Sequence, residues 1–167
     1  MTGVRPRWAA VAVAVDRTRA EPHLLLVRRA ARSGDPWSGD WAFPGGFGQA
    51  DDPDPEVTAR RETREEVGLV LGAATATLPR RWIVDPWRRR WVALVPVVFD
   101  AVEAALHPDP AEIADARWVP RSALSTVQRE WLRIRGSIPW WARVRRFDGG
   151  RVWGLTGAIL DDWSAGA

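Results

Sequence analysis

Hydrophobic residues near the start of the chain follow the pattern of two β-strands. Residues 8–15 (WAAVAVAV) alternate alanine with valine over most of their length, which favours a strand. His23–Arg29 contains an uninterrupted apolar run, as expected of a strand covered on both faces. Because charged residues end the first run abruptly at Asp16, we interpret it as the first strand of a sheet and not as a signal peptide. No run approaches transmembrane length, and we expect a cytoplasmic protein.

A polar segment with clear helix limits follows a glycine turn at Gly45 and Gly46. Asp54 is a good N-cap, and Pro55 fits the first helical position, where its missing N–H costs nothing. Gly68 can adopt the left-handed conformation that ends many helices. These signals predict an acidic loop and then a helix between Asp54 and Gly68.

Three carboxylates lie on one side of this predicted helix. At 100° per residue, Glu62 and Glu66 are about 40° apart, and Glu65 is about 60° to the other side of Glu62. Like charges at this spacing repel each other, and no lysine alternates with them. A hard divalent cation would relieve the repulsion, because Mg²⁺ prefers oxygen ligands and often binds beside phosphates. An exposed acidic helix without chemical function is the alternative.

The rest of the chain adds strand signals and a second main helix. We expect a strand or loop, a hairpin that turns at Asp85-Pro86, a short helix, and a strand end that turns through Gly154 into a terminal helix. The corresponding segments are residues 69–81, 81–100, 121–127 and 151–153. Strands that alternate with two main helices predict an α/β fold with a mixed sheet between helices.

Composition narrows the classes of function. A chain of 167 residues can bury a sizeable core, and we expect residues 1–167 to form a single domain. The absence of cysteine excludes disulfides, thiol catalysis and cysteine-ligated zinc, and two histidines make a histidine-based metal site or triad unfavourable. All 24 basic residues are arginine, but they are scattered and the net charge is only +3. We therefore do not expect a nucleic-acid-binding surface.

The segment from Phe43 to Leu69 resembles the Nudix box, whose usual form is G-x5-E-x7-R-E-U-x-E-E-x-G-U, with U a bulky aliphatic residue. The matching residues are Arg61, Glu62, Glu65, Glu66, Gly68 and Leu69. Gly45-Gly46 and Asp52 take the places of the glycine and the first glutamate if the loop is one residue longer. Thr63 stands where an aliphatic residue is usual, which weakens helix packing but not the metal site.

This resemblance implies the Nudix-type α/β/α sandwich and divalent-metal-dependent hydrolysis of a nucleoside diphosphate linked to another moiety. Mg²⁺ or Mn²⁺ would be the cofactor, with Glu62 and Glu66 as principal ligands and Glu65 as a further ligand or water-bridging partner. The Gly46 carbonyl is a further candidate ligand. Arg61 would hold Glu65, its neighbour four positions on.

One catalytic residue is expected outside the box. In the Nudix family, a loop glutamate before a W-x-P strand often completes the metal site or serves as base. Glu112 matches that place, because it precedes Trp118 by six residues. Asp115 is the competing candidate, and ordinary surface charge is the alternative for both.

The longer glycine loop is similar to that of the coenzyme A pyrophosphatase branch of this family. That branch has an upstream motif, roughly L-L-T-x-R-[SA]-x3-R-x3-G-x3-F-P-G-G, and the residues that fit it are Leu25, Leu26, Arg29, Ala30, Gly39, Phe43, Pro44, Gly45 and Gly46. Val27 replaces the threonine, and the second arginine is off register, with Arg32 the nearest. W-G-x-T before the terminal helix is also similar to this branch.

The resemblance therefore predicts coenzyme A or a derivative as the substrate, cleaved to 3′,5′-ADP and 4′-phosphopantetheine. A pyrophosphatase for ADP-ribose or other nucleoside diphosphate derivatives is the alternative, and a non-catalytic Nudix-fold binding module is a remote one. The partners expected are a small nucleoside diphosphate substrate, no nucleic acid and no membrane. A homodimer is one option for the assembly.

Phosphate groups need cationic partners, so most candidate substrate-binding residues are arginines. The candidates are Arg28, Arg29, Arg32, Trp41 and Arg88. The arginines at positions 88–90, near the hairpin tip, could clamp phosphates or belong to a solvated loop. Trp41 could stack on a base or pack inside the protein.

Overall fold

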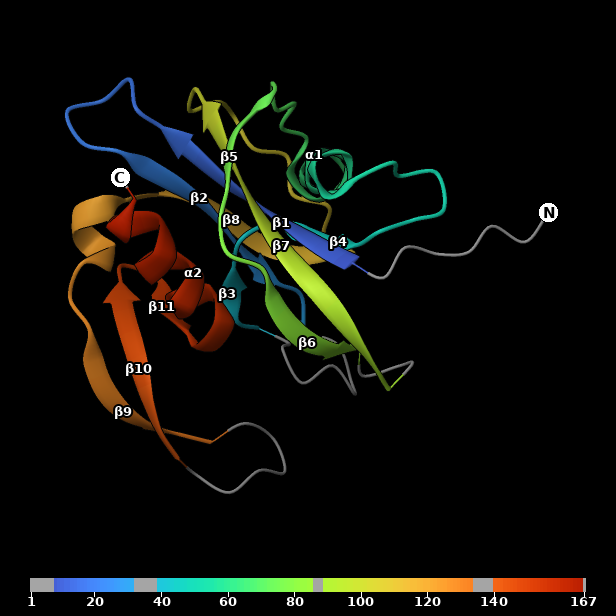
Figure 1. Cartoon of the computed structure of the whole chain (residues 1–167). Coiled ribbons are helices and arrows are strands. Elements are labelled where there is room, and N and C mark those ends of the chain that lie inside the picture. Colours follow the sequence, from blue (N-terminus) through green and yellow to red (C-terminus); the bar gives the residue numbers. More distant parts are fainter. Residues whose placement is uncertain (1–7, 32–38, 86–88, 134–139, 167) are drawn as a thin grey trace.

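The computed structural model describes residues 8–31, 39–85, 89–133 and 140–166. Within them, the chain forms eleven strands and two α-helices, with four strands before the first helix and seven between the two helices (Figure 1). The helices are α1 (Pro55–Val67) and α2 (Gly154–Ala165), and a 3-10 turn spans Arg121–Leu124. The strands are β1 (Trp8–Asp16), β2 (His23–Arg29), β3 (Trp41–Ala42), β4 (Gly45–Phe47), β5 (Ala74–Thr77), β6 (Arg81–Asp85), β7 (Arg90–Ala101), β8 (Ile113–Pro120), β9 (Gln128–Leu132), β10 (Trp140–Phe147) and β11 (Gly150–Trp153).

Strand β1 organises the main sheet, which is mixed as predicted. It runs parallel to β7 from Trp8 to Asp16 and antiparallel to β2 and β4. The end of β1, at Val15 and Asp16, pairs with β2. The first half of β1 pairs with β4, with Gly45 opposite Val11. The glycine turn is thereby held against the centre of the sheet.

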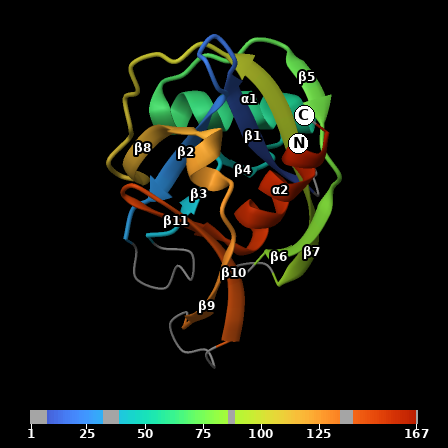
Figure 2. The same cartoon turned by 90° about the vertical axis from the view of Figure 1, so that its left-hand side faces the viewer.

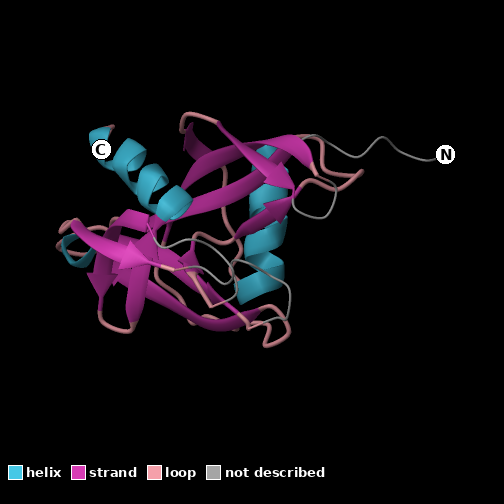
Figure 3. Cartoon of the chain, turned by 90° about the horizontal axis from the view of Figure 1, so that it is seen from below, coloured by secondary structure: helices cyan, strands magenta, loops and turns pink. Residues whose placement is uncertain are grey.

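The alternation of alanine and valine in β1 separates two buried layers. Ala10, Ala12 and Ala14 belong to the apolar cluster that includes Ala59 and Val67 of α1. On the opposite side of the strand, Val13 and Val15 belong to a second apolar cluster. The residues that α2 contributes to this cluster are Ile159, Leu160 and Trp163. The small alanine side chains leave room for α1 to approach the sheet. The two helices therefore cover opposite faces, which confirms the α/β/α prediction (Figures 2 and 3).

Helix α1 has the predicted limits. The Asp54 carboxylate accepts a hydrogen bond from the backbone N–H of Val57 at 2.9 Å, and Gly68 ends the helix at φ 73°. Thr63, which stands where the family usually has an aliphatic residue, is fully buried. Its hydroxyl donates to the Ala59 carbonyl at 2.8 Å, so the buried oxygen has a partner.

Two expectations need correction near the C-terminus. The short helix expected over residues 121–127 is only a 3-10 turn over Arg121–Leu124. Strands β9, β10 and β11 form a three-stranded antiparallel sheet, of which only β11 was expected. The β9–β10 ribbon extends away from the main body (Figure 1). Its residues mix tryptophan with arginine, so neither a clear apolar alternation nor a long apolar run marks these strands. Neither described α-helix has the length and apolar character needed to cross a membrane.

Candidate active site

The glycine turn and helix α1 meet at two of the predicted carboxylates. The backbone N–H of Gly45 donates to Oε2 of Glu66 at 3.0 Å. At Gly46, a Cβ atom would lie only 2.6 Å from the carboxyl carbon of Glu62. A side chain at this position would therefore overlap the carboxylate. The Gly-Gly pair lets the backbone of β4 lie directly against Glu62 and Glu66.

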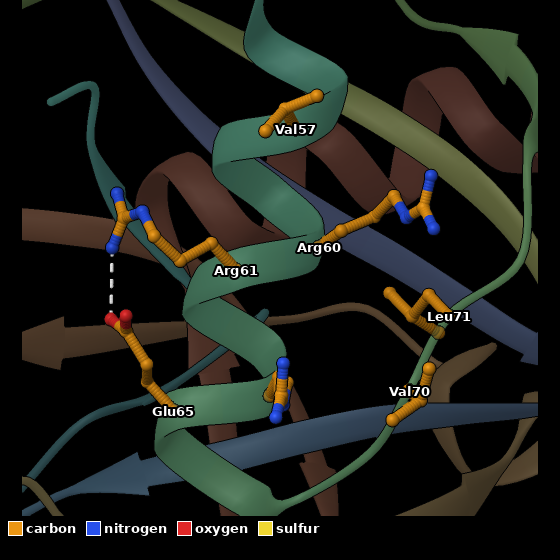
Figure 4. A pocket seen from close by; sticks show the side chains of 7 residues that line it. Val57, Arg60, Arg61, Glu65, Val70 and Leu71 are labelled. Carbon is orange, nitrogen blue, oxygen red and sulfur yellow. Dashed lines mark hydrogen bonds and ion pairs between the residues drawn. The ribbon is translucent and has the colours of Figure 1, made fainter. Parts of the chain in front are cut away.

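Arg61 ties the acidic loop to the helix. Its guanidinium lies 2.8 Å from carboxylate oxygens of both Glu62 and Glu65, and the Glu65 contact is visible in Figure 4. It also donates to Asp52 at 2.9 Å and to the carbonyl of Phe47 at 3.2 Å. The predicted contact between Arg61 and Glu65 is confirmed, and Asp52 holds the other side of the guanidinium.

Asp52 stays ionised in this network although it is nearly buried. Burial opposes ionisation, but hydrogen bonds from Arg61, from the N–H of Gln49 and from the Thr58 hydroxyl outweigh it and lower the pKa of Asp52. The Thr58 hydroxyl donates at 2.9 Å and the Gln49 N–H at 2.9 Å. We infer that Asp52, at the place of the first glutamate of the box, orients Arg61.

Burial changes the charge state of the two carboxylates beside the glycine turn. Glu66 is only 3% exposed, and burial raises its pKa to about 8. The hydrogen bond from the Gly45 N–H lowers this pKa, and the negative charge of Glu62 raises it further. Burial also raises the pKa of Glu62, although Arg61 opposes the shift. Two carboxylates that resist ionisation in isolation fit a divalent cation, because the cation supplies the missing positive charge.

The third carboxylate of the box is the most exposed of the three. The Glu65 side chain is 55% exposed, and the Arg61 guanidinium, which lies 2.8 Å from both carboxylates, bridges it to Glu62. Across the part of the chain that the structure describes, no three Asp, Glu, His or Cys side chains are grouped closely enough to form a metal site as they stand. The structure thus brings together a pair of glutamates, and Glu65 keeps its place as a predicted outer ligand or water-bridging partner.

Glu112 is placed near this pair, whereas Asp115 is not. The negative charge of Glu112 contributes to the raised pKa of both Glu62 and Glu66. Its backbone is anchored, because its carbonyl accepts from the N–H of Ala30 at 2.8 Å. Asp115 instead forms an ion pair with Arg117 at 2.9 Å. The geometry therefore favours Glu112 over Asp115 as the additional catalytic residue.

This placement predicts the effect of Glu112→Gln. If Glu112 activates water, kcat should fall about 10²-fold, as is usual for loss of a general base, with the Mg²⁺ dependence nearly unchanged. If it is a ligand, more Mg²⁺ should be needed for half-maximal rate. Initial rates over a series of Mg²⁺ concentrations separate the two cases. Asp115→Asn is the matched control and should leave both quantities unchanged; equal effects of the two substitutions would contradict the assignment.

Two of the predicted substrate residues line one cavity beside the glycine turn, namely Arg29 and Trp41. The charge of Arg29 favours ionisation of Glu66. Trp41 is 4% exposed and packs edge-on against Phe147, so most of its ring is also part of the core. Arg28 is not part of the cavity lining, and its guanidinium lies over the ring of Trp41, 6.0 Å from its centroid. Arg32 and Arg88 lie outside the described residues.

The cavity itself could not be anticipated from the sequence. Its volume is about 500 Å³, and its walls come from β1, β2, β3, β4, β6, β7, β11 and the start of α2. Trp153 contributes to the wall, and its indole N–H donates to the Asp40 carboxylate at 3.2 Å. These residues are far apart along the chain and carry no shared motif. Gly45 and Gly46 belong both to this cavity and to the contact with the glutamates.

Comparison with known proteins agrees with this site. The family model of the NUDIX domain matches residues 5–141. The chain is 31% identical over 164 residues to the human protein described as mitochondrial coenzyme A diphosphatase NUDT8, covering 94% of this chain and 68% of that protein. Both this match and the family model include the whole Nudix box.

Solved structures share the fold. The NUDIX domain of Shewanella oneidensis NrtR complexed with ADP ribose aligns with a TM-score of 0.57 at 24% identity, over 71% of this chain and 75% of that one. A C. elegans Ap4A hydrolase in a binary complex aligns with a TM-score of 0.62 at 16% identity, over 97% of this chain and 96% of that one. From the matched domain, the sequence relatives and the glutamate pair at the glycine turn, the chain belongs to the Nudix hydrolase family and is a pyrophosphohydrolase.

Proposed function

We propose that the protein hydrolyses the diphosphate of coenzyme A or a close acyl derivative, with Mg²⁺ or Mn²⁺ as cofactor. The observation that carries the chemistry is the pair Glu62 and Glu66, buried against Gly45 and Gly46 with pKa values raised by burial. Glu62 and Glu66 would hold the metal. When bound, the metal neutralises charge on the diphosphate oxygens and makes water more acidic.

The reaction consumes one water. Its oxygen forms a bond to one phosphorus of the diphosphate, and the bond from that phosphorus to the bridging oxygen breaks. For coenzyme A, the products are 3′,5′-ADP and 4′-phosphopantetheine, and the two protons of the water pass to the new phosphate groups or to solvent. Two contacts position the glutamates for this step: the backbone N–H of Gly45 holds Glu66, and Arg61 holds Glu62 at 2.8 Å. Glu112 is the candidate acceptor of the proton from water.

Two features support coenzyme A over other diphosphates. The human relative described as a coenzyme A diphosphatase is 31% identical over nearly the whole of this chain. The upstream motif also ends at the glycine turn that contacts Glu62 and Glu66, and Arg29 of that motif lines the adjacent cavity. Val27, the displaced second arginine and the extra loop residue remain departures from the motif.

A panel of diphosphates tests the substrate. We expect kcat/KM for coenzyme A to exceed that for ADP-ribose about tenfold or more, and to exceed that for 3′-dephospho-coenzyme A, because a 3′-phosphate gains from a cationic partner. Product masses should identify 3′,5′-ADP and 4′-phosphopantetheine. If ADP-ribose is instead cleaved at least tenfold more efficiently, the coenzyme A assignment is wrong, although the hydrolase chemistry stands.

A further inference from the structure

The cavity beside the glycine turn is mainly apolar. Its volume is about 500 Å³, comparable to pockets that take small-molecule ligands. The apolar part of its lining comes from six strands and the start of α2. Its larger aliphatic residues are Val11, Ile83, Val84, Leu94 and Leu155, and its aromatic residues are Trp41, Phe47 and Trp153. The lining therefore favours a ligand part with much apolar surface.

The charged groups of the cavity lie at Arg29 and Asp40. The charge of Arg29 acts on Glu66, so this side of the cavity is the one nearest the catalytic carboxylates. Asp40 already accepts the indole N–H of Trp153 at 3.2 Å. This hydrogen bond orients the Trp153 ring, which forms part of the wall. The remaining walls, aliphatic and aromatic, offer few polar partners to a ligand.

The two candidate substrates differ in what they would place here. Both contain an adenosine diphosphate half. The other half of ADP-ribose is a ribose, whose hydroxyl groups would lose water without gaining partners against mainly apolar walls. The other half of coenzyme A is pantetheine, which carries a gem-dimethyl group, methylene groups and a thiol. Burial of these groups is favourable by about 25 cal/mol for each Å² of apolar surface removed from water.

We propose that this cavity is the subsite for the pantetheine arm, with Trp153 as its oriented wall and Asp40 as the residue that positions Trp153. The inference rests on the proposed function and adds to it the place of one half of the substrate. Gly45 and Gly46 border both the cavity and the glutamates, so a diphosphate at the glutamates would be adjacent to an arm in the cavity. The adenosine half then lies outside the cavity.

Binding of the two product halves tests the proposal separately from catalysis. We would titrate the protein by calorimetry with 4′-phosphopantetheine and, in parallel, with 3′,5′-ADP. Trp153→Ala and Leu155→Ala should each weaken 4′-phosphopantetheine binding about tenfold or more, the range for losing contacts in an apolar pocket, while 3′,5′-ADP binding stays within about twofold. Leu155 is 39% exposed, so Leu155→Ala should fold normally. This variant therefore keeps the test valid even if Trp153→Ala fails to fold.

Two matched controls sharpen the result. Trp131→Ala removes an indole that is 59% exposed on β9, outside the cavity lining, and should change neither affinity. Asp40→Ala should weaken 4′-phosphopantetheine binding, whereas Asp40→Asn should restore it, because the amide oxygen can still accept the indole N–H. Rescue by Asn distinguishes positioning of Trp153 from a need for negative charge.

Each contrary outcome has a definite meaning. Weaker binding of 3′,5′-ADP alone, or no change of either affinity, would overturn the subsite while coenzyme A hydrolysis by the wild type could stand. Conversely, a wild type that binds 4′-phosphopantetheine in a Leu155-dependent manner but does not cleave coenzyme A would refute the proposed function and support the subsite.

Discussion

Replacing Glu66 by glutamine should lower kcat by about 10²-fold or more, because the change removes a charge that the catalytic cation needs. The variant should still fold, because glutamine keeps the shape of the side chain. In the wild type the Gly45 N–H donates to the Glu66 carboxylate at 3.0 Å, and the amide oxygen of glutamine can accept the same hydrogen bond. Burial raises the pKa of Glu66 to about 8, so a neutral group is tolerated there. The measurement is the steady-state rate at saturating Mg²⁺, together with the thermal midpoint.

The matched control for this experiment is Glu65→Gln. Glu65 lies one position before Glu66 but is 55% exposed and paired with Arg61, so its loss should cost less activity than the loss of Glu66. Excess chelator should abolish the wild-type rate, and Mg²⁺ or Mn²⁺ should restore it. Unchanged turnover in Glu66→Gln, or full activity in chelator, would refute the metal-dependent mechanism.

Adding a methyl group at Gly46 should impair catalysis without unfolding the protein. The Cβ of alanine would lie 2.6 Å from Cδ and 2.7 Å from both carboxylate oxygens of Glu62. The carboxylate is the end of a flexible side chain, so it can move away, and the backbone need not. Displacement of a catalytic group by about 1 Å can cost about 10²-fold in rate, and we expect a loss of that order in Gly46→Ala with a higher Mg²⁺ requirement.

Gly45→Ala is the informative comparison for that variant. Here the added Cβ would lie 2.2 Å from the carbonyl oxygen of Ala10 and 2.6 Å from Cα of Val11, both in the backbone of β1. The strand cannot move aside without losing its pairing with β7, so we expect this variant to lose stability, seen as a lower thermal midpoint. Equal stability losses at the two glycines, or normal activity in Gly46→Ala, would contradict the arrangement.

The sequence alone determined the local features of this protein, because each depends on residues close together in the chain. Helix α1 begins and ends as predicted, since the Asp54 cap, Pro55 and Gly68 act within one turn of the helix. The alternation of alanine and valine also predicted β1, and the Arg61–Glu65 contact followed from a spacing of four residues.

Tertiary structure decided which side chains converge. Helix geometry placed three glutamates on one side of α1, but the contact with Gly45 and Gly46 selects Glu62 and Glu66, while Glu65 is 55% exposed and paired with Arg61. Adjacent arginines also separate: Arg29 reaches the cavity, whereas Arg28 lies over Trp41. Successive side chains of a strand point to opposite faces, and only the neighbours of each face determine which arginine reaches the cavity.

The cavity and the β9–β10 ribbon are the features that no local pattern predicted. Asp40 and Trp153 are 113 positions apart and meet because β11 lies against β3. Glu112 was distinguishable from Asp115 for the same reason, since the register of β8 against β2 sets Asp115 opposite Arg28 and away from the glutamate pair. Such contacts depend on strand register and packing between distant segments, and the sequence of any single segment contains neither.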